Sequence, residues 1–173
     1  MSTFIVTMCV IFSCVRLLTL FISINNEKAL KKAGAKEYGR FNSIILTTLH
    51  ILFYFSACVE GYIKRVQYDQ VTIIGIIIYV SSMLALFYVI QKLSQIWTVK
   101  LIIAEDHPLD KSFLFRYIRH PNYFLNIIPE LIGWTLLLKS YVVFSIIFPV
   151  YMVSLSVRIK QEEKLMKLKF SDY

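Results

Sequence analysis

Long apolar runs separated by charged loops constrain this chain more than any other feature. Of its 173 residues, 57% are hydrophobic, which is more than a soluble domain of this size could bury. A helix of about 20 apolar residues crosses the hydrocarbon core of a bilayer. Five runs reach or approach that length: Thr3–Ile24, Ile44–Ile63, Val71–Gln91, Tyr123–Leu138 and Tyr141–Val157. The sequence therefore predicts an integral, multi-pass membrane protein.

The fourth and fifth runs are short, and only Lys139 and Ser140 separate them. We expect them to form a tight helical hairpin that either crosses with little tilt or penetrates only partly. No repeat, low-complexity segment or linker divides the chain. The predicted fold is all-α, with about five transmembrane helices in a single domain over residues 1–173.

The distribution of Lys and Arg predicts the orientation. Residues 25–43, 92–122 and 158–173 carry five each, whereas the loops on the other side carry three in total. The positive-inside rule therefore places the N-terminus outside and the C-terminus in the cytoplasm. Because the basic residues are divided among loops, the net charge of +8 favours contact with membrane lipids and argues against nucleic-acid binding. No obligate protein partner is inferred.

Two further segments have simple interpretations. Residues 25–40 are amphipathic and rich in Lys, with Gly34 and Gly39 as expected helix stops, so we expect them to lie along the cytoplasmic headgroup region. The three cysteines lie inside apolar runs and lack the spacing of metal ligands: Cys9, Cys14 and Cys58. They predict no disulfide framework, no metal site and no cysteine nucleophile.

Ionisable residues at membrane depth are costly and need an explanation. Arg16 and Glu60 lie close enough to an interface to be explained by topology or packing. His50 suits an interhelical hydrogen bond as well as it suits catalysis. Glu130 lies two helical turns beyond Tyr123, and it either lines a substrate cavity or pairs with Arg16 or His50.

Two charged clusters would meet on the cytoplasmic side. The first is Arg119-His120-Pro121-Asn122-Tyr123, and the second places Arg158 and Glu162 four residues apart on one helical face. Taken alone, Arg158 and Glu162 suggest an exposed ion pair that contributes only a few tenths of a kcal/mol. Beside the His-Pro cluster, an arginine and a carboxylate could instead bind a zwitterion or orient an anion.

These motifs resemble the C-terminal signature of the isoprenylcysteine carboxyl methyltransferase family of integral membrane enzymes. The resemblance extends upstream to His107-Pro108-Leu109-Asp110 and Trp97-Thr98. It is clearest from Trp97 to Leu165. Two departures affect the adenosine end of the expected pocket: Phe115 stands where many relatives carry tyrosine, and Lys100 where some carry glutamine.

The resemblance implies a cofactor, S-adenosylmethionine, in a cytoplasmic pocket built by a loop and the C-terminal helix within residues of about 92–173, and a lipophilic acceptor that enters from the bilayer. Arg158 would face the acceptor, and with Glu130 it is a candidate catalytic residue. The expected cofactor-binding residues are His107, Pro108, Leu109, Asp110, His120, Pro121, Asn122, Tyr123 and Glu162.

The predicted function is therefore S-adenosylmethionine-dependent O-methylation of a carboxylate or acidic hydroxyl on a lipophilic substrate, either isoprenylcysteine-like or alkylpyrone-like. Such a donor is already activated, so the site needs chiefly to align the acceptor and exclude water. The short form of the chain suggests a bacterial plasma membrane. Two alternatives remain open at this point: a membrane NADPH-dependent reductase of the sterol reductase type, and a non-catalytic small transport subunit.

Overall fold

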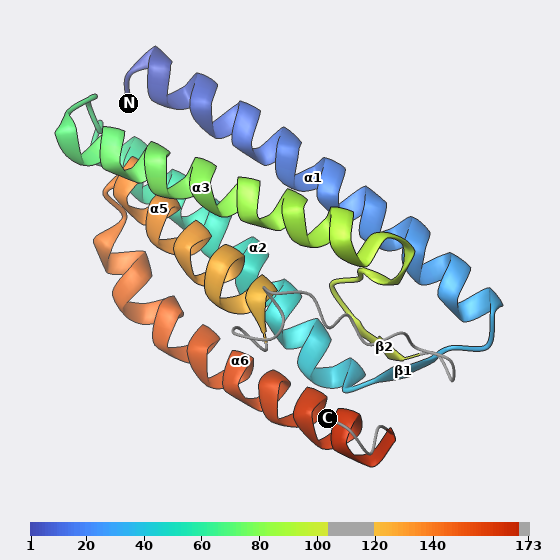
Figure 1. The fold of residues 1–173 in the computed structure, drawn as a ribbon. Helices are drawn as coiled ribbons and strands as arrows, with labels where there is room; N and C mark the ends of the chain where they lie inside the picture. Colours follow the sequence, from blue (N-terminus) through green and yellow to red (C-terminus); the bar gives the residue numbers. More distant parts are fainter. Residues whose placement is uncertain (104–119, 170–173) are drawn as a thin grey trace.

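The structure is a computed structural model, and it describes residues 1–103 and 120–169 (Figure 1). Most of these residues lie in long helices. The elements in chain order are α1 (Thr3–Lys32), β1 (Lys36–Tyr38), α2 (Arg40–Ile63), α3 (Gln70–Leu93), the 3₁₀ turn η1 (Ser94–Ile96), β2 (Leu101–Ile103), the π-helical η2 (Asn122–Ile127), α5 (Ile128–Leu138) and α6 (Tyr141–Lys169).

Four helical segments are long and apolar enough to cross a membrane: Thr3–Lys32, Arg40–Ile63, Gln70–Ile96 and Tyr141–Leu168. This confirms the all-α, polytopic fold. The fourth predicted run forms only η2 and the 11-residue α5, which fall short of the about 20 residues that cross the hydrocarbon core, so this segment spans it only where the bilayer is thinner. The fifth run extends through Lys169, well beyond its predicted end.

The first helix also continues past its predicted end at Ile24. The expectation that residues 25–40 follow the headgroup region fails for their first half, because α1 runs straight on to Lys32 (Figure 1). The polar side chains of this extension bind the segment that follows α3. Asn26 donates to the carbonyls of Ser94 and Trp97, at 2.9 Å each.

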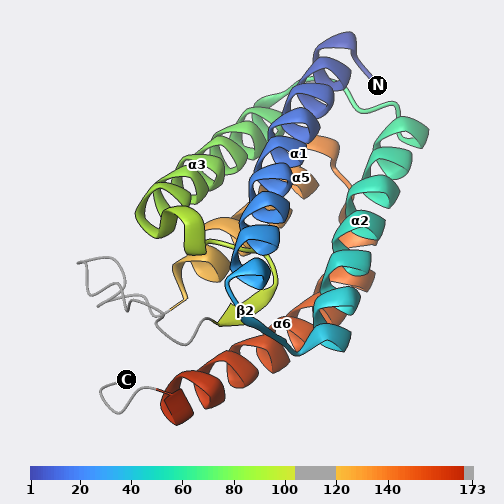
Figure 2. The ribbon, with the colours of Figure 1, turned by 90° about the vertical axis from the view of Figure 1, so that its right-hand side faces the viewer.

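A short two-stranded sheet ties the same two segments together. In this sheet β1 pairs antiparallel with β2, and Glu37 lies opposite Ile102. The sheet and the N-terminus lie at opposite ends of the bundle (Figure 2). Gly34 and Gly39 flank β1 with φ values of +87° and +58°, in the left-handed region that glycine adopts most readily. Gly34 follows the end of α1, as predicted, whereas Gly39 precedes the start of α2 and is not a helix stop.

The predicted hairpin between α5 and α6 is confirmed. Lys139 adopts a left-handed backbone with a φ of 49°, and the amide of Ser140 donates to Thr135 O at 3.0 Å. Glu60 of α2 accepts hydrogen bonds from the Val142 and Val143 amides at the start of α6, at 3.1 and 2.9 Å. The carboxylate of Glu60 therefore caps a helix, which fits its interpretation as a structural group.

Glycines allow α3 and α5 to pack backbone against backbone. A Cβ atom added at Gly133 would lie 2.7 Å from the Tyr79 amide nitrogen, and one at Gly75 would collide with the Leu137 amide nitrogen. Small residues at a helix crossing permit such an approach inside a membrane. This contact fixes α5, and with it the π-helical turn that precedes it.

We expect Gly75→Ala to lower the free energy of unfolding by about 1–3 kcal/mol, because the added methyl group meets backbone that cannot rotate away. Thermal unfolding in detergent would measure the effect. Ser81→Ala is the matched control, since Ser81 is exposed on the same helix and should unfold within about 0.5 kcal/mol of the parent. A melting temperature for Gly75→Ala equal to that of the control would contradict this packing.

Candidate functional site

The N-terminal end of η2 positions the His-Pro cluster. Pro121 leads directly into η2, and His120 O accepts from the amides of Tyr123 and Phe124, at 3.0 and 3.2 Å. Pro129, one turn beyond, has no amide proton to donate, and such positions favour local departures from α-helical geometry. Single π-helical turns occur often at functional sites. Here the turn brings the His120 and Tyr123 rings into a stack with centroids 5.6 Å apart.

His120 and Tyr123 converge on a carboxylate of α6. The Tyr123 hydroxyl donates to Glu162 Oε2 at 2.6 Å, and His120 Nδ1 lies 3.3 Å from Glu162 Oε1. The other ring nitrogen of His120 lies 3.5 Å from Glu163 Oε1. Three residues that the sequence predicts as cofactor ligands therefore form one hydrogen-bonded cluster.

The charge state of His120 follows from its neighbours. Burial opposes protonation of its imidazole, but Glu162 and then Glu163 outweigh burial and raise the pKa of His120 above its ordinary value. The ion pair is therefore fully present below the ordinary pKa of about 6.5. Its contribution to stability is lost as the pH rises through the higher pKa of the folded protein.

Arg158, one helical turn before Glu162, is buried with 3% of its surface exposed. Its Nη1 donates to the Ser43 hydroxyl at 2.7 Å, its Nη2 to Val99 O at 3.1 Å, and its Nε to the Tyr123 hydroxyl at 3.4 Å. No carboxylate of residues 1–103 or 120–169 lies within ion-pair distance of Arg158.

The exposed Arg158–Glu162 ion pair suggested by the sequence alone is thus not formed. The Tyr123 hydroxyl stands between the two groups instead, accepting from the guanidinium and donating to the carboxylate. A guanidinium carries five N–H donors, and the three hydrogen bonds above leave two of them without a partner among the described residues. The buried guanidinium of Arg158 is therefore placed to bind an anionic ligand.

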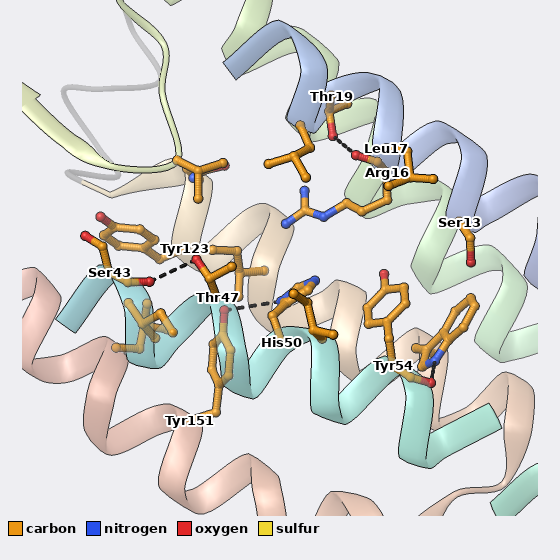
Figure 3. A pocket seen from close by; sticks show the side chains of 18 of the residues that line it. Ser13, Arg16, Leu17, Thr19, Ser43, Thr47, His50, Tyr54, Tyr123 and Tyr151 are labelled. Atoms are coloured by element: carbon orange, nitrogen blue, oxygen red, sulfur yellow. Dashed lines mark hydrogen bonds between the residues drawn. The ribbon is translucent and has the colours of Figure 1, made fainter. Parts of the chain in front are cut away.

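A cavity of about 440 Å³ lies beside Arg158. Most of its wall is apolar and comes from α1, α2 and α6 (Figure 3). Its polar lining includes Asn122, Tyr123 and Arg158 at one end and Arg16, His50 and Tyr54 further along. A slot of this kind suits an amphiphile with a polar head and an apolar chain.

Several polar atoms of the cavity wall are buried without a partner among the described residues. Asn122 Oδ1 and Trp97 Nε1 make no hydrogen bond to the part of the chain that the structure describes. Buried polar atoms are rarely left unpaired, so both point to a ligand with matching groups. Together with the Tyr123–Glu162 pair, this donor set fits an amino-acid-bearing nucleoside such as S-adenosylmethionine.

Glu130 lies deeper and is fully buried. Its Oε1 is 3.1 Å from Arg16 Nε and 3.4 Å from His50 Nε2, and it accepts a hydrogen bond from the Tyr54 hydroxyl. Of the two roles open to it, pairing with Arg16 and His50 is the one observed. It is these partners, rather than Glu130 itself, that reach the cavity. A role of Glu130 in the reaction stays a prediction.

The structure brings together the described residues predicted for the cofactor and the acceptor. His120, Pro121, Asn122 and Tyr123 precede or begin η2, and Arg158 and Glu162 face them from α6. Lys100 forms an ion pair with Glu27 at 2.7 Å. The remaining candidates lie outside the described residues: His107, Pro108, Leu109 and Asp110, together with Phe115.

One face of α2 supplies four cavity residues, and only His50 among them was considered in the sequence analysis. Ser43, Thr47, His50 and Tyr54 all line the cavity from α2 (Figure 3). Their spacing of four, three and four residues places them on one helical face. This polar stripe within an apolar run could have been recognised in the sequence, because polar side chains are costly on a helix face that contacts lipid.

Fold and site together define an integral membrane protein with a polar cluster at one end of an apolar cavity. Residues 73–168, more than half of the chain, match the isoprenylcysteine carboxyl methyltransferase (ICMT) family. The chain belongs to this family of membrane methyltransferases, which is the family that its motifs predict.

Two relatives are similar over most of their lengths. An uncharacterized protein of Haemophilus influenzae is 46% identical over 158 residues, which is 90% of this chain and 92% of that protein. The uncharacterized protein YpbQ of Bacillus subtilis is 27% identical over 146 residues, 84% of this chain and 86% of that protein. No solved structure matches.

We expect His120→Gln to lower the free energy of unfolding by about 1–2 kcal/mol at pH 6, where the protonated ring donates to the carboxylates of α6. The difference should shrink as the pH rises through the pKa of His120, because the parent loses the ion pair. Thermal melts in detergent from pH 6 to 9 would measure it. Lys160→Gln, at an exposed position of α6, is the control. Parallel pH profiles for the parent and His120→Gln would contradict the assigned charge state.

Proposed function

We propose that the protein transfers a methyl group from S-adenosylmethionine to a carboxylate or acidic hydroxyl of a lipophilic acceptor. The observation that carries this proposal is Arg158, a buried guanidinium without a carboxylate partner among the described residues, at the head of an apolar cavity. An ionised oxygen that satisfies its two free N–H groups would sit at a fixed place beside the His-Pro cluster.

The bridging hydroxyl of Tyr123 sets the relation between the two halves of the proposed site. Glu162 would bind the ammonium group of the cofactor, and Arg158 would bind the acceptor anion. Because Tyr123 contacts both side chains, it fixes their separation. Bound S-adenosylmethionine would supply an activated methyl group on a sulfonium, so the protein needs only to hold an ionised oxygen in line and keep water out.

The remaining proposed contacts follow from the unpaired groups. Asn122 Oδ1 and Trp97 Nε1 would hydrogen-bond to the cofactor or the acceptor head, and His120 would hold Glu162 in place. The apolar slot would take the acceptor chain from the bilayer. The two bacterial relatives support a bacterial plasma membrane. The distribution of Lys and Arg supports an N-terminus outside and a C-terminus in the cytoplasm.

The proposal divides binding and turnover between two residues of α6. In nanodiscs, the protein should bind S-adenosylmethionine with micromolar affinity and should not bind NADPH. Glu162→Gln should weaken that binding at least tenfold, since a charge-assisted hydrogen bond contributes about 1.5–3 kcal/mol. Calorimetric titration would measure both ligands. Binding of NADPH instead would refute the proposal and favour a reductase.

Arg158→Lys should leave S-adenosylmethionine binding within about threefold of the parent but should reduce methyl transfer about a hundredfold, because lysine cannot present a planar pair of donors. Transfer of a labelled methyl group to a bacterial lipid extract would report turnover. Lys160→Gln serves as a control that should retain both properties. Equal losses of cofactor affinity in Arg158→Lys and Glu162→Gln would refute this division of roles.

A further inference from the structure

The cavity holds a second guanidinium that the proposed reaction does not use. Arg16 of α1 lines the cavity about half-way along its length, and its side chain is 20% exposed. Only its Nε is near an acidic group, 3.1 Å from Glu130 Oε1. Its two terminal nitrogens have no hydrogen-bond partner within residues 1–103 and 120–169. Figure 3 shows the guanidinium reaching from α1 toward the side of α2 that carries His50.

Unsatisfied groups gather around Arg16. His50 Nε2 and Glu130 Oε2 are buried without a hydrogen-bond partner in the described structure, and His50 also lines the cavity. The ion pair between Arg16 and Glu130 balances their two charges. It leaves His50 Nε2 and Glu130 Oε2 without hydrogen-bond partners among the described residues. Each unpaired polar group at membrane depth is costly, so a ligand oxygen that accepts hydrogen bonds from Arg16 or His50 would be bound strongly.

The two guanidiniums are well separated along the slot. Ser43, which contacts Arg158, and His50, which faces the Arg16 cluster, are seven residues apart on α2. At 1.5 Å of rise per residue this separation is about 10 Å. The cavity continues past His50 to Cys58, so the apolar part of a ligand extends beyond the second cluster.

We propose that the Arg16–His50 cluster is a second polar subsite, which binds an oxygen function in the chain of the acceptor about 10 Å from its anionic head. A hydroxyl or a ketone fits, because Arg16 can donate to either one. A further carboxylate does not, since Glu130 already neutralises Arg16. This inference rests on the proposed function and specifies its substrate class: an oxygenated amphiphile, rather than an acid with a plain hydrocarbon chain.

Two probes of equal length test the subsite in nanodiscs. Octadecanoic acid has a plain chain, and 10-hydroxyoctadecanoic acid carries a hydroxyl near its middle. The two tryptophans of the chain, Trp97 and Trp134, both line the cavity, so their fluorescence reports binding directly. We expect the hydroxy acid to bind about tenfold more tightly, as one hydrogen bond to a charged group implies.

Variants assign the preference to Arg16. The double variant Arg16→Met with Glu130→Gln removes both charges together, so no unpaired carboxylate is left buried. It should bind the two acids with equal affinity. Arg16→Lys keeps a cation beside Glu130 in case the double variant does not fold, and it should reduce the preference at least threefold. Leu18→Met, two residues beyond Arg16 at an exposed position of α1, is the control and should retain the full preference.

The outcomes separate the two proposals. If Arg158→Met weakens both acids equally and the parent shows no preference for the hydroxy acid, the subsite is refuted while the head-group site stands. If the preference is present and survives loss of Arg16, the subsite is likewise refuted. If octadecanoic acid binds independently of Arg158 while the Arg16-dependent preference remains, the subsite is supported and the proposed function fails.

Discussion

The burial of Arg158 is the constraint on which the site depends. A guanidinium stays ionised in a protein, and removing it from water costs several kcal/mol unless its donors are satisfied. Its three hydrogen bonds go to α2, to the segment after η1 and to η2, through Ser43, Val99 and Tyr123. Because these three segments come from distant parts of the sequence, a single side chain of α6 joins them at the end of the bundle that carries the sheet.

The length of α1 helps to position the hydrogen bond between Arg158 and the carbonyl of Val99. Its extension past Ile24 binds residues 94–100, and the Ser23 hydroxyl accepts a hydrogen bond from the Val99 amide at 2.9 Å. The carbonyl of that residue then meets Arg158. The polar residues at the end of α1 thus contact residues 94–100, whereas composition alone predicts that they contact lipid headgroups. The extension supports the site indirectly, because its side chains bind the segment that carries Val99.

Much of the fold could be predicted from apolar runs and turn residues, because a span, a glycine boundary and the Lys139 turn are local properties. The site was predictable where motif residues are adjacent, as in His120 to Tyr123. Other features could not be read from the sequence. The burial of Arg158 and its separation from Glu162 depend on a hydroxyl 35 residues away, and the partners of Glu130 lie on α1 and α2. The polar stripe of α2 can be found in the sequence, but the many apolar residues around it make it easy to overlook.

The free donors of Arg158 also bear on product release in the proposed reaction. An anionic acceptor forms charge-assisted hydrogen bonds to the guanidinium, each contributing about 1.5–3 kcal/mol, whereas a neutral ester or ether contributes about 1 kcal/mol per bond. Methylation removes the charge of the acceptor, so affinity at Arg158 falls by roughly tenfold or more. This fall in affinity requires no conformational change in the cavity. An unpaired buried cation can therefore hold the anionic substrate firmly and release the neutral product into the bilayer.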